Sequence, residues 1–437
     1  MNNAISLSSF DATERISTRA LRPETYRHLL EHVSTEKVAI ARGAGLSYSA
    51  ASFGSGVVSI DVTRFDRILS YDKATGGVEV EPGVRVGRLM EFLAQRGRYL
   101  PALPGYPTIT VGGCIGFDIH GKSQFHSGNF GRWLQEFELH HKDHGRLTCS
   151  QTREAELFQL TQGGAGLTGI ITKAKLRTLP LPGTAVEVQA LPVKDLREAA
   201  DVLRAQANDA DCLYSWNDLN LRGTRFGRGL VFSERFVDAQ PQQQAPRATL
   251  DLRARLPFRV WNGAATTAAL AAFYHMQLRS QPQLLSLEAA AFPIYGKEYY
   301  YAAFGRSGFR EYQLIVPFEH WSGFITSLEQ QIERARIPVT LGSLKLFHGE
   351  SENLRFCMDG ICLALDVPAS RRASALFEEL DKLAIQFGAL VNLSKDSRLT
   401  AELCQQVFPE YDSFRVALAR FDAKRRYQSR LRTQVGV

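Results

Sequence analysis

Apolar and polar positions follow two periods along this chain, and the two periods predict a mixture of helices and strands. In the first 183 residues, apolar runs bounded by glycine or proline predict strands at 36–42, 57–62, 77–83 and 167–183. Helical spacing occurs at 86–97, where Gly97 is a suitable C-terminal stop. The ending Pro-Leu-Pro-Gly at 180–183 marks a domain boundary.

The remaining chain changes character after this boundary. Residues 184–389 predict longer helices at 196–209, 321–336 and 373–388, and strands at 213–219, 229–236, 312–317, 344–347 and 361–368. The polar stretch Gln240–Arg247 predicts a loop or surface insertion. A short strand and then helix follow. We therefore expect a first domain over 1–183, an α+β cap over 184–389 and a C-terminal return over 390–437.

Composition places the chain among globular proteins. Its 437 residues predict about two or three domains, and 44% hydrophobic with 22% charged residues exclude wholesale disorder. No run of about 18 apolar residues is present, and the first residues lack the pattern of a secretory signal. The six cysteines include no CxxC pair, which favours free thiols, no structural metal and a cytoplasmic location.

Positive charge is concentrated at the C-terminus. The net charge is +7, and the segment from Arg415 onward carries seven basic residues and one acidic residue, Asp422, or +6. This pattern fits either a solvated terminal helix or a contact with phosphate or acidic lipid. No nucleic-acid motif accompanies it, so nucleic acid is not an expected partner.

The first of three glycine loops, Ala41–Tyr48 (ARGAGLSY), directly follows a predicted strand. Its glycines allow backbone N–H groups to approach an anion, although a simple tight turn explains them equally well. A Rossmann fold requires a helix to open at such glycines. Here a polar loop and another strand follow, which excludes that fold.

Two further glycine loops make a cofactor site the better interpretation. Five glycines fall within 105–121 among apolar residues, and a third loop, Gly163–Thr172, leads into a strand. Such segments either follow a ligand or are disordered, and their apolar content argues against disorder. Three glycine loops in one domain suit a long, bent cofactor with a central diphosphate.

These loops together resemble those of vanillyl-alcohol-oxidase/PCMH-type flavoproteins. Within that group, DIHGK at 118–122 followed by HSGNFG, and NLSKDSR at 392–398, resemble the decaprenylphosphoryl-β-D-ribose 2′-oxidase family. YSWNDL near 214 and EYQLIVP near 311 extend the likeness through the cap. The resemblance implies an α+β fold in which a PCMH-type FAD-binding domain of two α+β subdomains carries an inserted substrate cap.

The resemblance also implies FAD as the cofactor. The residues that it places along the cofactor are Arg42, Gly43, Ala44, Gly45, Leu46, Ser47, Tyr48, Gly105, Thr110, Val111, Gly112, Gly113, Phe117, Asp118, His120, Ile170 and Asn392. Leu46 and Ser47 stand where many relatives carry a flavin-linked histidine. We therefore predict that FAD is bound non-covalently.

The implied chemistry is oxidation of a secondary alcohol by hydride transfer to flavin N5. Lys395 and His120 are the predicted catalytic residues. Lys395 suits either a base of lowered pKa or an orienting cation, and His120 has the ordinary alternative of a hydrogen-bonded core histidine. The predicted substrate contacts are Tyr48, Trp216, Tyr295, Gln313, Lys345 and Lys395, with core packing the slightly favoured explanation for Trp216.

Four departures from the family pattern leave the sugar open. The first loop continues Ser49-Ala50 rather than Gly-Asp, Glu311 stands where glutamine is common, Asn392 replaces an aromatic residue, and Ala364 replaces a pocket cysteine. Cys362, two residues earlier, shares the face of Ala364 if this segment is a strand. None of these changes removes a predicted cofactor contact.

The expected activity is oxidation of the 2′-hydroxyl of a lipid-linked sugar phosphate, a polyprenylphosphoryl-β-D-ribose. A separate NAD(P)H-dependent short-chain reductase is the expected partner for epimerisation to arabinose. The basic C-terminus suggests peripheral contact with the inner face of the plasma membrane. One alternative is an aldonolactone or alditol oxidase, which is disfavoured because those enzymes tend to have a GTHG-like sequence where this chain has DIHGK. Another alternative is a non-catalytic flavin-binding scaffold.

Overall fold

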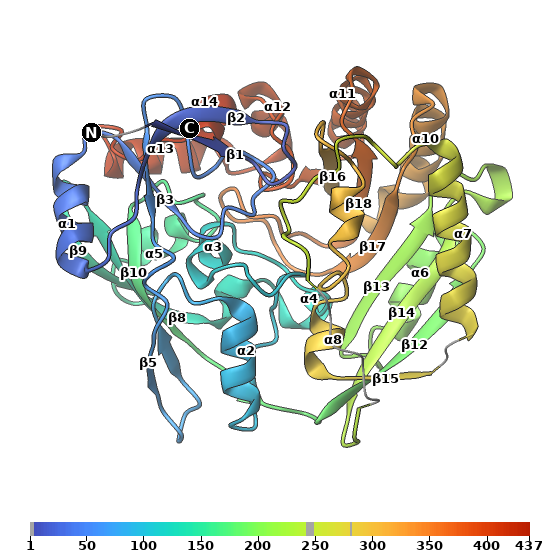
Figure 1. Cartoon of the computed structure of the whole chain (residues 1–437), viewed down its shortest axis with the longest axis horizontal. Helices are drawn as coiled ribbons and strands as arrows, with labels where there is room; N and C mark the ends of the chain where they lie inside the picture. Colours follow the sequence, from blue (N-terminus) through green and yellow to red (C-terminus); the bar gives the residue numbers. More distant parts are fainter. Residues whose placement is uncertain (1–3, 242–248, 280–281) are drawn as a thin grey trace.

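The computed structural model describes residues 4–241, 249–279 and 282–437. It contains four sheets in two units that face each other, shown on the left and right of Figure 1. This mixture of helices and mainly antiparallel sheets confirms the predicted α+β class. Most of the polar stretch predicted at 240–247 lies outside the described residues.

The first unit contains two main sheets. One has the order β1-β2-β4-β3, built from Ala4–Ser8, Arg15–Leu21, Val58–Asp61 and Ala39–Arg42. The other has the order β5-β6-β10-β8-β9, built from Ile68–Tyr71, Val78–Val80, Ile170–Leu176, Leu134–His141 and Gly145–Ser150. A small ribbon pairs β7 (Arg98–Tyr99) with β11 (Leu179–Pro180). The helices between them are α1 (Tyr26–Thr35), α2 (Val86–Ala94), α3 (Val111–Gly116), α4 (Gln124–Ser127) and α5 (Ala155–Thr161).

The cap is built on one eight-stranded sheet, of order β15-β12-β14-β13-β17-β18-β16-β19. Its strands are Gln283–Leu285, Ala185–Val193, Arg228–Val237, Cys212–Asp218, Leu341–Phe347, Gly360–Pro368, Phe309–Val316 and Leu390–Val391. The cap helices are α6 (Leu196–Gln206), α7 (Gly263–Arg279), α8 (Leu287–Ala291), α9 (Tyr299–Ala302), α10 (Trp321–Ala335) and α11 (Arg371–Gln386). α6 and α11 pack on the sheet, and α10 packs on both of them.

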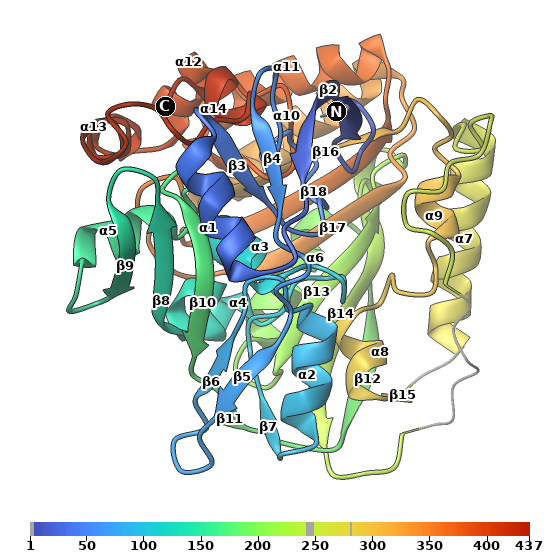
Figure 2. The ribbon, with the colours of Figure 1, turned by 60° about the vertical axis from the view of Figure 1, so that its left-hand side comes forward.

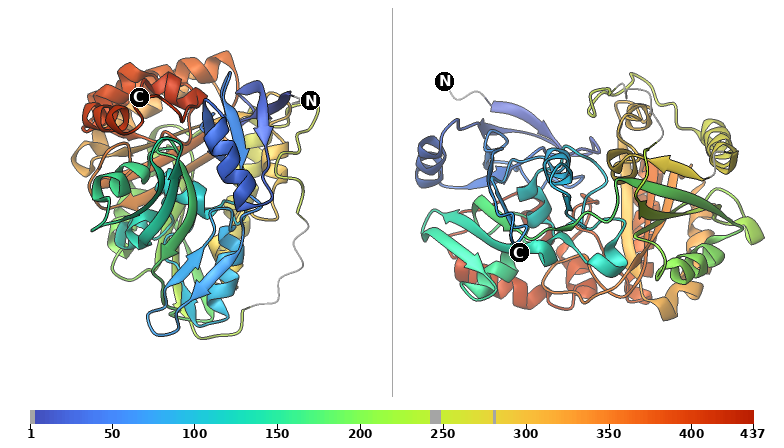
Figure 3. Two further views of the ribbon diagram at one scale, coloured as in Figure 1. Left: turned by 90° about the vertical axis from the view of Figure 1, so that its left-hand side faces the viewer. Right: turned by 90° about the horizontal axis from the view of Figure 1, so that it is seen from below.

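The C-terminal segment returns to the first unit, as Figure 3 shows. After β19 it forms α12 (Ala401–Val407), α13 (Tyr411–Phe421) and α14 (Arg430–Val435). Tyr427 forms a bridge with Ala39 at the edge of β3, and Arg430 N donates to Phe53 O at 2.8 Å. The same segment therefore contributes an edge strand to the cap sheet and a brace to the first unit.

Local sequence explains where several helices begin. Asp195, Ser370 and Thr110 each accept a hydrogen bond from a backbone N–H in the first turn of α6, α11 and α3. The sequence did not predict α3, because residues 105–121 are rich in glycine and show no amphipathic pattern. Among the described residues, no helix is both long and apolar enough to cross a membrane.

Candidate active site

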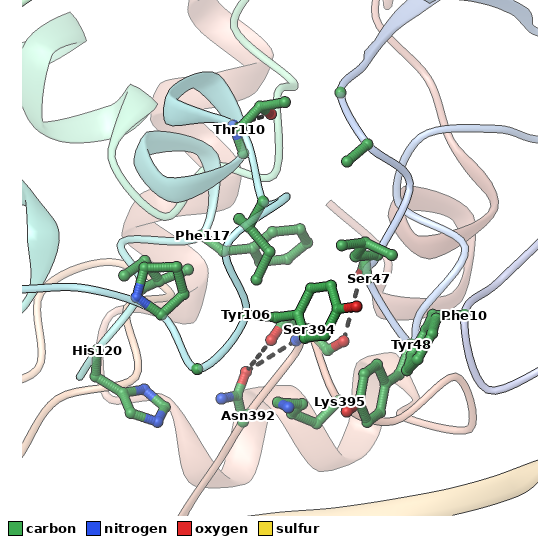
Figure 4. Close-up of a pocket in the computed structure, with 18 of the residues that line it drawn as sticks. Phe10, Ser47, Tyr48, Tyr106, Thr110, Phe117, His120, Asn392, Ser394 and Lys395 are labelled. Atoms are coloured by element: carbon green, nitrogen blue, oxygen red, sulfur yellow. Dashed lines mark hydrogen bonds between the residues drawn. The ribbon is translucent and has the colours of Figure 1, made fainter. Parts of the chain in front are cut away.

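A cavity of about 380 Å³ lies between the two units. All three glycine loops form its wall on the side of the first unit, and β13, β16, β17 and β18 contribute side chains from the cap. Ser394 and Lys395, which follow β19, close one end. Figure 4 shows Lys395 between Asn392 and Tyr48, with His120 further along.

Backbone builds the wall at the first glycine loop. A Cβ atom on Gly43 would lie 2.2 Å from Thr110 Oγ1, so only glycine allows the first and second loops to approach this closely. Among the described residues, no acceptor is recorded for the backbone N–H groups of residues 43–47. Gly45 has φ +66°. This run of unsatisfied donors beside a cavity forms an anion-binding nest.

The second glycine loop has a different part. Val111 N donates to Val84 O, Gly112 N donates to Pro82 O, and Gly113 N donates to Thr110 Oγ1. The backbone N–H groups in the first turn of α3 therefore donate to acceptors within the protein. Ala165 N of the third loop donates to Gly116 O at 2.7 Å, which joins the second and third loops into one surface.

A chain of side-chain amides fixes the imidazole of His120. Asn392 Oδ1 accepts from Ser394 N at 2.9 Å, Asn392 Nδ2 donates to Gln313 Oε1 at 2.6 Å, and Gln313 Nε2 contacts His120 Nε2 at 3.3 Å. This order makes His120 Nε2 the acceptor and leaves the proton on Nδ1. Burial, followed by the charges of Lys345 and Lys395, lowers the pKa of His120 well below its usual range. His120 is thus a neutral donor.

Lys395 lies in a charged cluster. Its Nζ is 3.1 Å from Glu311 Oε1 and 4.1 Å from the centre of the Tyr48 ring. Glu311 is paired in register with Asp366 across β16 and β18, and both are buried. Tyr300 Oη donates to Asp366 Oδ2 at 2.8 Å, whereas Asp366 Oδ1 is buried without a recorded partner in the described chain.

The environment of Asp366 determines its protonation. Burial, and then the neighbouring Glu311 carboxylate, raise the pKa of Asp366 well above its usual range. Asp366 therefore carries a proton under conditions in which an exposed aspartate is ionised. Glu311 is the carboxylate within ion-pair distance of Lys395 Nζ.

Two further lysines reach the cap side of the cavity. Lys345 on β17 lines it, has no recorded hydrogen-bond or ion-pair partner among the described residues, and has a pKa lowered by burial. Lys122 is instead tied to Glu234 of β14, 2.5 Å from its Oε1, and to Ala290 O. Lys345 can bind an anion, whereas Lys122 joins the two units.

Most of the residues that the sequence singled out line this cavity. They are Gly43, Ala44, Gly45, Leu46, Ser47, Tyr48, Gly105, Thr110, Gly112, Gly113, Phe117, His120, Trp216, Gln313, Lys345, Asn392 and Lys395. Trp216 also packs on Phe273 of α7, with ring centres 4.2 Å apart, which confirms its packing role and leaves its contact with substrate a prediction. Their roles toward a ligand stay predictions.

Five predicted contacts are absent from the described cavity wall. Val111 and Ile170 are fully buried in the core. Asp118 accepts from Gly131 N at 2.6 Å, and Arg42 turns to Ser52 Oγ at 2.7 Å. Tyr295 packs on Tyr106 instead. These side chains hold the loops that form the wall, and their neighbours face the cavity.

Sequence reasoning missed Asp366 and Tyr300 and noted Glu311 only as a departure. Residues 362, 364 and 366 of β18 share one face by the two-residue period of a strand. A polar residue at the third of these positions was therefore a readable signal. No cluster of three or more metal-ligating side chains occurs among the described residues.

Comparison with known proteins covers nearly the whole chain. Residues 22–150 match a family model described as an FAD binding domain. The chain is 30% identical to decaprenylphosphoryl-beta-D-ribose oxidase of Mycolicibacterium smegmatis over 390 residues, 86% of this chain and 84% of that protein. An uncharacterized protein in the mprA 5′ region of Streptomyces coelicolor is 29% identical over 81% of this chain and 100% of its own length. L-Gulonolactone oxidase of Mus musculus is 30% identical over 32% of this chain and 31% of its own.

The cavity suits the cofactor that this domain type binds. The free N–H groups of 43–47 fit a diphosphate, and the glycine-lined walls leave room for flat rings. These features and the match through both units confirm the resemblance seen in the sequence. The chain is an FAD-dependent oxidoreductase and belongs to the decaprenylphosphoryl-β-D-ribose oxidase family.

Proposed function

We propose that this chain oxidises the 2′-hydroxyl of a polyprenylphosphoryl-β-D-ribose-like sugar to the 2-keto sugar. One observation carries the proposal: the similarity to the Mycolicibacterium oxidase runs through the cap, and the cap supplies Gln313, Lys345 and Asp366 to the cavity. The similarity to L-gulonolactone oxidase is confined to about a third of the chain.

Bound FAD would supply the hydride acceptor, and the residues around the cavity would orient the sugar. The ion pair with Glu311 favours the orienting cation over the base for Lys395, because a paired ammonium has no free lone pair. Its remaining N–H groups would hold the reacting oxygen as the hydroxyl proton passes to solvent water and negative charge develops there. Neutral His120 would donate through Nδ1 to the ring system or to the sugar.

Lys345 is the proposed contact for the substrate's phosphate. It lines the cavity, and no carboxylate within ion-pair distance of it is recorded in the described chain. A cation held without a counter-ion in a partly dry cavity gains most from an anionic ligand. This division assigns the hydroxyl to Lys395 and the phosphate to Lys345.

The direct test is anaerobic bleaching of the flavin absorbance by farnesylphosphoryl ribose, compared with a panel of alditols and aldonolactones. We expect bleaching by the phosphoryl ribose alone. Bleaching by the small polyols instead would identify a lactone- or alditol-type oxidase. A protein that holds FAD and is bleached by none of them would be a flavin-binding scaffold.

We also propose that FAD is held without a covalent bond, because residues 43–48 contain no histidine or cysteine. Acid precipitation should release all the flavin into the supernatant. Yellow colour retained in the pellet would contradict this.

The 2-keto product would require a second enzyme for the epimerisation. An NAD(P)H-dependent short-chain reductase that returns the hydride to the opposite face would yield the arabinose form. Adding such a reductase to the product mixture should consume NAD(P)H in proportion to the flavin bleached. If no NAD(P)H is consumed, the proposed epimerisation is wrong, while the proposed oxidation by this chain still stands.

A further inference from the structure

One edge of the cap exposes large apolar side chains. They lie in 249–260 and 297–306, which we call the cap rim, and they are Leu250, Leu256, Phe258 and Tyr299. Phe258 is 63% exposed and Leu250 52%. Leu256 N donates to Ala302 O and Val260 N to Ala303 O, so the two segments of the rim run together. Figure 2 shows α9 of the rim along the same side of the molecule as α7.

The charges of the cap rim are mostly positive. Arg253, Arg259, Lys297 and Arg306 are exposed on it, and Asp251 is the one exposed carboxylate that the structure describes there. Glu298 is buried and accepts from Tyr106 Oη at 2.8 Å. Arg253 Nη2 donates to Gly45 O of the first glycine loop at 2.7 Å. No ion pair of Arg259 or Arg306 is recorded within the described chain. Apolar side chains surrounded by such arginines are typical of surfaces that dock on anionic bilayers.

In the C-terminal basic segment, by contrast, most of the positive charges are paired with carboxylates. Six of its seven basic residues lie within ion-pair distance of a carboxylate, including Arg420 with Glu156, and Lys424 and Arg426 with Asp143. Arg432 is buried against Asp422. These partners cancel much of the +6 that the sequence shows, and Val416 is the large apolar side chain exposed on α13.

The cap rim also adjoins the cavity. Leu252, Tyr300 and Tyr301 line the cavity, and they alternate in sequence with the exposed Leu250, Arg253 and Tyr299. The same two segments thus wall the cavity on one side and meet solvent on the other. The polyprenyl tail of a substrate whose sugar occupies the cavity would leave past this rim.

We infer that the cap rim is a membrane-docking surface, with Phe258 and Leu250 entering the interface of an anionic phospholipid bilayer and Arg259 and Arg306 facing its headgroups. The assignment of the tail's route rests on the proposed function, but the surface is defined by its exposed residues. Interfacial binding of this kind combines buried apolar area with attraction to anionic lipid. It replaces the C-terminal segment as the expected membrane contact.

The test is flotation of the FAD-loaded full chain with vesicles of phosphatidylcholine and phosphatidylglycerol, against vesicles of phosphatidylcholine alone. We expect binding to the anionic vesicles only, weakening as salt is added. Phe258→Ser with Leu250→Ser should lower the partition coefficient about ten-fold or more. Arg259→Gln with Arg306→Gln should lower it about five-fold for each arginine.

The matched controls lie on the other basic surface. Val416→Ser removes a side chain that is 61% exposed, close to the exposure of Phe258, and Arg425→Gln with Arg426→Gln removes two C-terminal charges. Both control variants should float like the unaltered chain. Loss of flotation in the controls but not in the rim variants would overturn the inference.

Two other results would also overturn it. One is no flotation of the unaltered chain with any vesicle. The other is a dimer that Phe258→Ser dissociates without any vesicle binding, which would make the rim a contact between copies. Flotation that depends on the rim in a protein not bleached by farnesylphosphoryl ribose would support docking while rejecting the proposed substrate.

Discussion

The two walls of the cavity are built from different materials. The wall of the first unit consists of glycine loops, of which the first leaves the backbone N–H groups of residues 43–47 without a recorded acceptor in the described chain, and a single added Cβ at Gly43 has no room. The opposite wall consists of charged and amide side chains, led by Glu311 and Gln313 on β16 and by Lys395 in the turn after β19. Substitutions in the first wall should therefore act mainly through the shape of the cavity, and substitutions in the second mainly through its charge.

The largest expected effect is on the cap wall. Lys395→Ala removes the only side chain we assign to the reacting oxygen, and loss of such a contact typically costs about 10²–10³ in rate. Anaerobic stopped-flow bleaching with farnesylphosphoryl ribose measures it, and the flavin content of the purified variant serves as control. A variant with full flavin and an unchanged bleaching rate would remove Lys395 from the reaction.

The next effect is on the glycine wall. Gly43→Val places a branched side chain where Thr110 Oγ1 lies 2.2 Å from the Cβ position. Separating the first two loops should weaken FAD binding about a hundred-fold, the cost of roughly 3 kcal/mol of overpacking. Titration of the apoprotein with FAD, followed by flavin fluorescence, measures the Kd. Gly263→Ala, a position with no atom within 4 Å of the added Cβ, is the control and should leave the Kd unchanged.

The difference between the backbone wall and the side-chain wall also explains which parts of the site could be predicted from the sequence. Glycine loops after strands are visible in sequence because their function lies in the backbone, and the strand before Gly43 and the loop itself were predicted. The strand period of β18 marked the position of Asp366, but the cluster itself could not be predicted, because Asp366 is distant in sequence from Glu311 and Tyr300 and meets them through strand pairing and packing. α3 was hidden because its helix is held by tertiary hydrogen bonds rather than by an amphipathic pattern.

A smaller effect should follow from the charge partner of Lys395. Glu311→Gln keeps the shape of the side chain but removes the ion pair at 3.1 Å. Since the glutamine amide can still hydrogen-bond to Lys395, we expect the reaction to survive with a bleaching rate about ten-fold lower and an unchanged FAD Kd, the size of a partly exposed positioning contact. An unchanged rate across the whole pH range would show that Glu311 does not position Lys395.

The smallest expected effect is on stability and concerns Asp366, the cross-strand neighbour of Glu311. Because the pKa of Asp366 is raised in the folded state, the folded chain binds a proton more readily than the unfolded chain between the two pKa values. Stability linked to Asp366 is therefore fully present at pH below the unfolded pKa and is lost as pH rises through the folded pKa. Asp366→Asn keeps the acceptor for Tyr300 and cannot ionise, so its Tm should exceed that of the unaltered chain by about 2 °C at alkaline pH and by nothing at acid pH. Thermal unfolding followed by circular dichroism across pH measures this difference. A Tm difference that grows toward acid pH would mean that Asp366 is ionised in the folded protein, and the cap wall would then hold two carboxylates opposite Lys395.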